Sequence, residues 1–190
     1  MDNPLDWRIA YIRKIINTLS DVLDEVYQTP YENLEPSKVI EREKLIENII
    51  GMGFLTSQIY ISGTIADAKM SSGEPKNITK KRLFKEYGKL LSGTDITSIA
   101  LCDAYANYYK HNEEWMGKSI DQLSPNAVNT IRALNSAGIN VLPEENCMVE
   151  VPFNRIIDLL LITSKGVEIP ALLLILSEWR SRVMNSVLRK

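Results

Sequence analysis

Apolar residues recur at three- and four-residue steps along most of the chain, the spacing that places them on one face of an α-helix. The first run predicts a long amphipathic helix that reaches Tyr27, capped by Asp2 or Asn3, with Pro4 in its first position. Pro30 ends it, because proline cannot continue the helical hydrogen-bond ladder. Its apolar positions are Leu5, Ile9, Ile12, Ile16, Leu19, Leu23 and Val26.

A second helical pattern begins at the N-cap residue Ser37 and extends to Lys69. Gly51 and Gly53 interrupt it, and glycine at such places breaks a helix, kinks it or lets another helix approach closely. We therefore expect a kinked or two-part helix. The β-branched residues at positions 58–61 leave a short strand as the alternative for that segment.

A basic helix is predicted at residues 79–91, after a loop at residues 70–77. Lysines at four-residue intervals form one side of this helix, and apolar residues form the opposite side. Such a stripe is typical of a solvated helix face. The second interpretation is a surface that contacts phosphates, because basic and aromatic residues together bind single-stranded nucleic acid. The lysines of the stripe are Lys81, Lys85 and Lys89.

Residues 94–116 predict a helix of about six turns with many polar and aromatic side chains. Thr94 and Asp95 are N-cap residues, and Gly117 suits a helix end. On a helical wheel one face is apolar, a polar stripe lies beside it, and His111, the only histidine, falls at the boundary. The apolar face contains Ala100, Leu101, Ala104, Tyr105, Tyr108 and Trp115, and the polar stripe contains Asp103, Asn107, Lys110 and Glu114.

The next helix has a clear start and a clear end. Ser124 and Pro125 form an N-cap and first-position pair, and Gly138 is expected to end the helix in a left-handed conformation. Residues 140–151 follow as an irregular segment.

The last third of the chain is the most apolar. Residues 153–163 predict a buried helix and residues 164–168 a loop. Pro170 opens a final helix that has almost no polar face until Arg180. A helix that is apolar nearly all round lies at the centre of a bundle or in a subunit interface, so we expect a homodimer or a deeply central helical hairpin.

These patterns predict an all-α fold: a single domain over residues 1–190, built as a helical bundle of six to eight helices. The net charge of −2 gives no overall basic field that would favour RNA, DNA or an anionic membrane. The longest uncharged run, residues 48–66, is too polar for a membrane span, and the first residues lack a signal-peptide pattern. We expect a cytoplasmic protein with no membrane partner, whose Cys102 and Cys147 are reduced.

Several catalytic and cofactor-binding motifs are absent. The sequence has no glycine-rich phosphate loop and no GxSxG nucleophile elbow. One histidine excludes an HExxH motif and any two-histidine metal site. We therefore expect neither a metal nor a cofactor.

His111 has two interpretations. Asn107 lies four residues before it and Glu114 three after it, within reach on the same helix, and Asp103 lies one turn further. Either these residues satisfy a structural histidine, or His111 is a general acid or base that Glu114 or Asp103 orients while Asn107 binds substrate. The same choice, between core and ligand cage, applies to the aromatic residues Tyr105, Tyr108 and Trp115.

The segment from Asn107 to His111, together with position 106, resembles the RNxxxH signature of the HEPN family, the higher eukaryotes and prokaryotes nucleotide-binding domains. This resemblance implies an α-helical bundle and, as in many members, a metal-independent ribonuclease that works as a dimer, often in defence and toxin systems. In the family, an arginine and a histidine act together on the scissile RNA phosphate. Asn107 and His111 match the signature, whereas Ala106 stands in place of the arginine.

Two classes of function follow from the sequence. The first is a non-enzymatic, all-helical interaction or regulatory protein that forms a homodimer. The second is a HEPN-like enzyme that processes RNA or a nucleotide through His111, Asn107 and Asp103. A cleft that combines these residues with Lys81 and Lys85 favours the second class, and complete burial of His111 favours the first.

Overall fold

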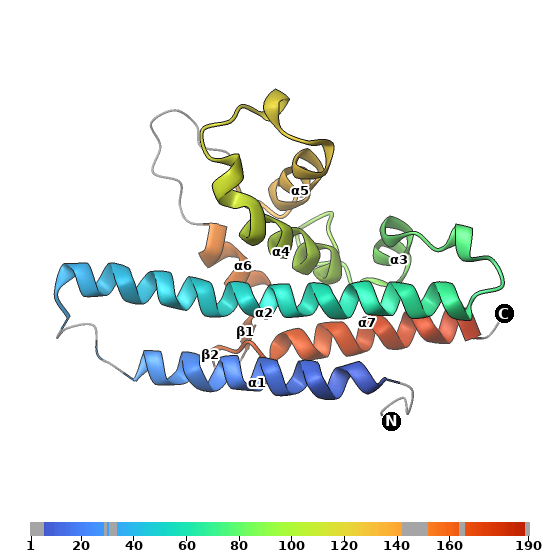
Figure 1. The fold of residues 1–190 in the computed structure, drawn as a ribbon, viewed down its shortest axis with the longest axis horizontal. Helices are drawn as coiled ribbons and strands as arrows, with labels where there is room; N and C mark the ends of the chain where they lie inside the picture. The colour runs from blue at the N-terminus through green and yellow to red at the C-terminus, as the bar shows by residue number, and fades with distance from the viewer. Residues whose placement is uncertain (1–5, 29, 31–33, 142–151, 164–165, 189–190) are drawn as a thin grey trace.

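The computed structural model describes residues 6–28, 30, 34–141, 152–163 and 166–188, and these residues form an all-α fold (Figure 1). Seven α-helices lie within them, in agreement with the six to eight that the sequence predicts. The predicted caps Asp2 and Asn3, the segment 142–151 and Cys147 lie outside the described residues. The helices are α1 (Trp7–Tyr27), α2 (Pro36–Ser71), α3 (Lys80–Tyr87), α4 (Ser98–Trp115), α5 (Pro125–Asn135), α6 (Pro152–Leu160) and α7 (Ala171–Leu188).

Helix α2 is the long central element of the bundle (Figure 1). Its 36 residues extend over roughly 54 Å. Helices α1 and α7 pack along one side of it, and α4 packs on the other side and carries α5. One continuous apolar core joins these elements, with fully buried residues that include Ile16, Ile50, Phe54, Ile61, Ile99, Leu101, Leu172, Leu176 and Trp179.

By length and composition alone, α2 is also the one helix in the described part of the chain that is long and apolar enough to cross a membrane. Of its most apolar stretch, 56 % is buried inside the fold. The buried core helix of a soluble protein has the same length and composition.

The glycines of α2 allow neighbouring segments to approach closely. Helix α2 is continuous from Pro36 to Ser71, so the two-part helix and the alternative strand at residues 58–61 are both wrong. A Cβ atom on Gly51 would collide with the ring of Tyr109, and one on Gly53 would lie 3.0 Å from the side chain of Ile169. Side chains from α4 and from the segment before α7 therefore lie against the α2 backbone. Of the roles expected for these glycines, the structure shows the close approach of a neighbouring segment.

Two predicted helix starts are wrong because a later residue forms the cap. Asp6 caps α1, its side chain accepting a hydrogen bond from the Ile9 amide at 3.3 Å, so the start expected at Asp2 or Asn3 is several residues too early. Thr97 caps α4 in the same way through the Ala100 amide. The predicted cap Thr94 instead lies in a turn before the helix.

The basic helix is shorter than predicted. Helix α3 ends at Tyr87, and Lys89 lies beyond it, where its carbonyl accepts a hydrogen bond from the Ser98 amide at 2.8 Å. Leu90 and Thr97 form an isolated antiparallel bridge, which leads the chain directly into α4. The predicted loop before α3 is also shortened, because α2 continues to Ser71 and a 3-10 turn (Pro75–Asn77) follows.

The C-terminal part contains a small strand pair that the sequence did not predict. Helix α6 ends at Leu160, and β1 (Ile162–Thr163) then pairs with β2 (Gly166–Val167) in antiparallel register. The end of the helix predicted at 153–163 and the loop predicted at 164–168 are therefore wrong in part. Three helix-end signals are confirmed: Ser124 caps α5, and Gly117 and Gly138 have φ values of 71° and 74°. The predicted cap Ser37 is wrong, because α2 begins one residue earlier, at Pro36 after the N-cap Glu35.

Helix α7 is buried between α1, α2 and α3. Leu172, Leu176 and Val183 face the core, which accounts for most of its apolar surface. The indole nitrogen of Trp179 donates to the Leu83 carbonyl at 3.3 Å and so fixes α7 to α3.

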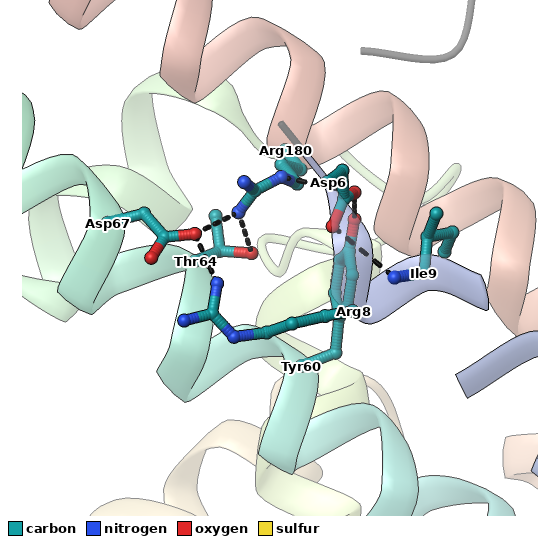
Figure 2. A network of polar contacts seen from close by, with 7 residues as sticks. All are labelled: Asp6, Arg8, Ile9, Tyr60, Thr64, Asp67 and Arg180. Carbon is teal, nitrogen blue, oxygen red and sulfur yellow. Dashed lines mark hydrogen bonds and ion pairs between the residues drawn. The ribbon is translucent and has the colours of Figure 1, made fainter. Parts of the chain in front are cut away.

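A network of charged and polar residues joins α7 to α1 and α2 (Figure 2). Arg180, which is 4 % exposed, donates to Asp67 at 2.8 Å and to the Thr64 hydroxyl at 3.3 Å. Its Nε lies 3.1 Å from the carboxylate of Asp6. Asp67 also pairs with Arg8, and the Tyr60 hydroxyl donates to Asp6. Each charge in this network therefore has an opposite charge beside it, which offsets the cost of its burial.

Candidate functional site

An open cleft of about 1180 Å³ lies among α3, α4 and α5. Helix α4 contributes the polar stripe predicted from the sequence, and α3 contributes lysines. Helix α5 adds small polar residues, among them Ser124, Asn126 and Asn129. The charged and aromatic residues that line the cleft are Lys80, Lys81, Phe84, Lys85, Asp95, Asp103, Lys110, His111, Glu114 and Trp115.

The lysines of the cleft differ in their partners. Lys80 forms an ion pair with Asp103 at 2.6 Å. For Lys81, Lys85 and Lys110, no carboxylate of the described residues lies within 4.0 Å. All three are exposed, and they come from two helices. The lining therefore combines four lysines with the three carboxylates of Asp95, Asp103 and Glu114, a small excess of positive charge in a chain whose net charge is −2.

Asp103 is the centre of a small hydrogen-bond network beneath the cleft. The residue is 6 % exposed, and its carboxylate accepts hydrogen bonds from Gln58 at 3.2 Å and Asn107 at 3.4 Å. Gln58 also donates to the Asn107 side-chain oxygen at 3.0 Å. With Lys80 added, Asp103 is fully engaged in positioning its neighbours. The functional interpretation of the sequence allowed Asp103 to orient His111, but in the structure the contacts of Asp103 are with other residues.

His111 is one of the residues that line the cleft. Its Nδ1 is 3.1 Å from a carboxylate oxygen of Glu114, and its side chain is 34 % exposed. The imidazole is stacked on the Trp115 indole, with ring centres 6.2 Å apart and planes inclined by 15°. Of the partners proposed from the sequence, Glu114 is therefore the one in contact, whereas Asn107 bonds with Gln58 and Asp103.

The three aromatic candidates have different environments. Tyr105 is 1 % exposed and packs edge-to-face on Phe54, with ring centres 4.8 Å apart. Burial raises the pKa of its hydroxyl above the usual range, which keeps it neutral. Tyr108 is half-buried between Tyr105 and Trp115. Only Trp115 of the three lines the cleft, and it offers a ring surface there.

Position 106 points away from the cleft. Ala106 is fully buried, on the core side of α4. It lies five residues before His111, so on a regular helix the two side chains point about 140° apart. An arginine at this position would enter the core.

The described residues offer no metal site and no reactive thiol. They contain no group of three or more histidine, cysteine, aspartate or glutamate residues that could hold a metal ion. Cys102 is fully buried, and burial together with the nearby charge of Asp103 raises the pKa of its thiol. The thiolate that a nucleophile requires is therefore disfavoured.

Two residues of the site were not singled out from the sequence. Gln58 reaches the α4 stripe from α2, 45 positions away in the chain, and no local pattern marks it. Lys80 begins the basic helix and is four residues from Phe84, over whose ring its ammonium lies at 5.6 Å. The four-residue spacing between Lys80 and Phe84 places their side chains next to each other on α3, and this spacing is the sequence signal that could have identified Lys80.

In comparisons with known proteins, no protein-family model, no curated protein and no solved structure matched this chain.

Proposed function

We propose that this chain is a non-enzymatic helical protein that binds a phosphorylated ligand, a nucleotide or a short single-stranded RNA, in the α3–α4–α5 cleft. The observation that supports this function is a set of three lysines, Lys81, Lys85 and Lys110, that have no carboxylate of the described residues within 4.0 Å and surround a cleft that Trp115 also lines. Lysine ammonium groups bind phosphates, and aromatic faces stack with bases. A base on Trp115 and phosphates along the lysines use both features together.

The polar residues of α4 give this ligand an orientation. Asn107 lines the cleft, held by Gln58 and Asp103. An amide that is fixed in this way presents a defined edge to a base or a ribose, because its rotamer is set before the ligand arrives. Asp103 contributes to this orientation indirectly, because its carboxylate accepts a hydrogen bond from Asn107.

The second candidate is the HEPN-like enzyme. Two observations favour it. The cleft combines His111, Asn107 and Asp103 with Lys81 and Lys85, the arrangement that the sequence analysis associates with this class, and the Glu114 carboxylate, 3.1 Å from Nδ1, can orient the imidazole for proton transfer. The buried Ala106 weighs against it, since the cation that would stabilise the charged phosphate is missing from that position. We therefore place binding first and phosphate-ester cleavage second.

Binding is tested by fluorescence anisotropy of the full chain with a labelled single-stranded oligoribonucleotide and, separately, with fluorescent ATP. The double substitution Lys81→Ala/Lys85→Ala should weaken binding by about tenfold, and Trp115→Ala should weaken it as well. About three phosphate contacts should give a slope of roughly −2 in a plot of log K against log salt concentration. A matched control is Lys44→Ala/Lys69→Ala, which removes two exposed lysines of α2 outside the cleft and should leave binding unchanged.

The same samples separate the two candidates. The proposed function requires bound RNA to stay intact on a denaturing gel. Cleavage by the parent that disappears in His111→Gln, with binding retained, would establish the enzyme instead. Equal loss of binding in the cleft variants and the control variants would mean that the cleft is not the binding site.

A further inference from the structure

Six of the large apolar side chains that α1 and α2 expose to solvent form two sets at regular helical spacing. On α1, Tyr11, Ile15 and Val22 are 65 %, 46 % and 39 % exposed. On α2, Leu45, Met52 and Ile59 are 45 %, 51 % and 68 % exposed. We call this set the α1–α2 face. Each of these side chains costs free energy in water that burial would recover.

The two sets border the seam between the helices. Arg8 of α1 lies against Gly63 of α2, and Ile16 lies near Gly53, so the two helices run antiparallel (Figure 1). In that register Tyr11 is level with Ile59. By the same register, Ile15 lies within about one turn of Met52, and Val22 within about one turn of Leu45.

Helical spacing places both sets on the seam. Ile15 and Val22 follow Arg8 at intervals of seven residues, and Arg8 is in contact with α2. Ile59 precedes Gly63, which is in contact with α1, by four residues. The α2 residues are themselves seven apart, the interval at which a helix presents a continuous line of side chains to another helix. The α1–α2 face therefore suits two further helices rather than a loop.

The charges of α1 indicate which helices these are. Lys14 lies in its N-terminal half, and Asp21 and Glu25 lie in its C-terminal half, all exposed. The helix dipole favours the reverse order, with acidic residues near the start and basic residues near the end. A second α1 that runs antiparallel to the first supplies the missing complement, because it places a basic half opposite an acidic half.

We propose that a second copy of this chain docks on the α1–α2 face, through a two-fold axis near Thr18. Such an axis brings Lys14 of one protomer opposite Asp21 of its partner and makes Ile15 level with Val22. The contact is isologous, as closed dimers require, and joins the two α1–α2 pairs into a four-helix layer. The cleft among α3, α4 and α5 is formed by other helices, so dimerisation does not depend on the proposed ligand.

Sedimentation equilibrium of the full chain at micromolar concentration tests the interface. The parent should have twice the chain mass of 21.6 kDa. Ile15→Glu and Ile59→Glu should each raise the dissociation constant by on the order of tenfold or more, since a charge is buried without a partner. Both side chains are exposed in the single chain, so the thermal midpoint of the dissociated protein should stay close to that of the parent. The matched control is Leu174→Glu, an apolar residue of α7 that is 62 % exposed and lies outside this face.

A charge exchange tests the orientation of the two copies. Lys14→Glu should weaken the dimer, and Lys14→Glu/Asp21→Lys should restore it, because opposite charges again meet across the axis. A parent that is monomeric, including one whose α1–α2 face is covered by a different protein, overturns the proposal. A dimer that survives Ile15→Glu and Ile59→Glu overturns it as well, and so does one that Leu174→Glu disrupts equally.

Discussion

The ring of Tyr109 on α4 occupies the space that a Cβ atom on Gly51 of α2 would need. The Tyr109 hydroxyl also donates to the side chain of Asn48, one turn before Gly51, at 2.9 Å. A glycine inside a helix costs about 1 kcal/mol relative to alanine. Here the cost is offset by the close approach of the helix that carries the candidate site.

Replacement of Gly51 should therefore destabilise the fold only while Tyr109 is present. Gly51→Ala in the parent should lower the free energy of unfolding by about 1–2 kcal/mol, because the added methyl group displaces the ring and breaks its hydrogen bond. In a Tyr109→Ala background, the same substitution should be neutral or should stabilise by up to about 1 kcal/mol. Urea unfolding of the four chains gives this coupling directly. Equal effects of Gly51→Ala in both backgrounds would contradict the packing argument.

The buried charge of Arg180 should be among the most sensitive positions of the bundle. Arg180→Ala leaves Asp6 and Asp67 each without one cationic partner, and the loss of one member of a buried ion pair costs about 3–5 kcal/mol. At this chain length we expect the thermal midpoint to fall by roughly 6–20 °C. Differential scanning calorimetry measures the change.

Arg182 is the matched control, two residues away on the same helix. It pairs with Glu178 at 3.0 Å, and both side chains are more than 40 % exposed. A surface pair of this kind contributes about 0–1 kcal/mol, so Arg182→Ala should change the midpoint by no more than a few degrees. Similar losses for the two arginines would mean that Arg180 is not held as the network indicates.

Asp67 should contribute to stability in a pH-dependent way. Burial by itself raises the pKa of this carboxyl, but the hydrogen bonds and charges of Arg8 and Arg180 outweigh burial and hold the pKa below its usual value. A depressed pKa in the folded state means that the carboxylate stabilises the fold at pH values above the unfolded pKa of about 4. This contribution is lost as the pH falls through the folded value.

The difference in unfolding free energy between the parent and Asp67→Asn should therefore be largest near neutral pH and shrink below about pH 4. Urea unfolding across this range provides the measurement. Asp158→Asn, at an exposed position on α6, should show little difference at any pH. A gap between parent and Asp67→Asn that is constant with pH would contradict the assigned cause.

The sequence predicted the helices better than the contacts between them. The apolar spacing and the Ser124–Pro125 start were sufficient for the helices, because these signals are local. The course of α2 through Gly51 was not predicted, because the reason for that glycine is the ring of Tyr109, 58 positions away. The start of α4 was missed for a local reason: Thr94, Asp95 and Thr97 are all competent caps, and the turn before the helix selects the last.

The candidate site was predicted in the same uneven way. The polar stripe of α4 lies along the cleft as its spacing indicated, and Lys81 and Lys85 face the same cleft. The hydrogen bonds within the stripe were not predictable, because Asn107 and Asp103 bond with Gln58 of α2 and not with His111. Long-range polar pairs of this kind leave no periodic pattern in the sequence.

His111 should contribute little to stability. The structural interpretation of the sequence implies a partly buried ring whose loss leaves a polar partner unsatisfied. In the structure its partner Glu114 is 67 % exposed at the side chain, so water can replace the imidazole. An exposed pair contributes about 0–1 kcal/mol, and His111→Ala should lower the thermal midpoint by less than roughly 4 °C.

Glu114→Ala is the matched variant for His111, because it removes the other half of the same contact. The two substitutions should have similar small effects, and the double variant should cost less than their sum, since the contact can be lost only once. Trp115→Ala should cost more than either, because it removes the ring on which His111 stacks and against which Tyr108 packs. Thermal unfolding of the four variants and the parent tests this order. A fall of more than about 6 °C for His111→Ala alone would mean that the imidazole carries buried contacts, and the structural interpretation of this histidine would then apply.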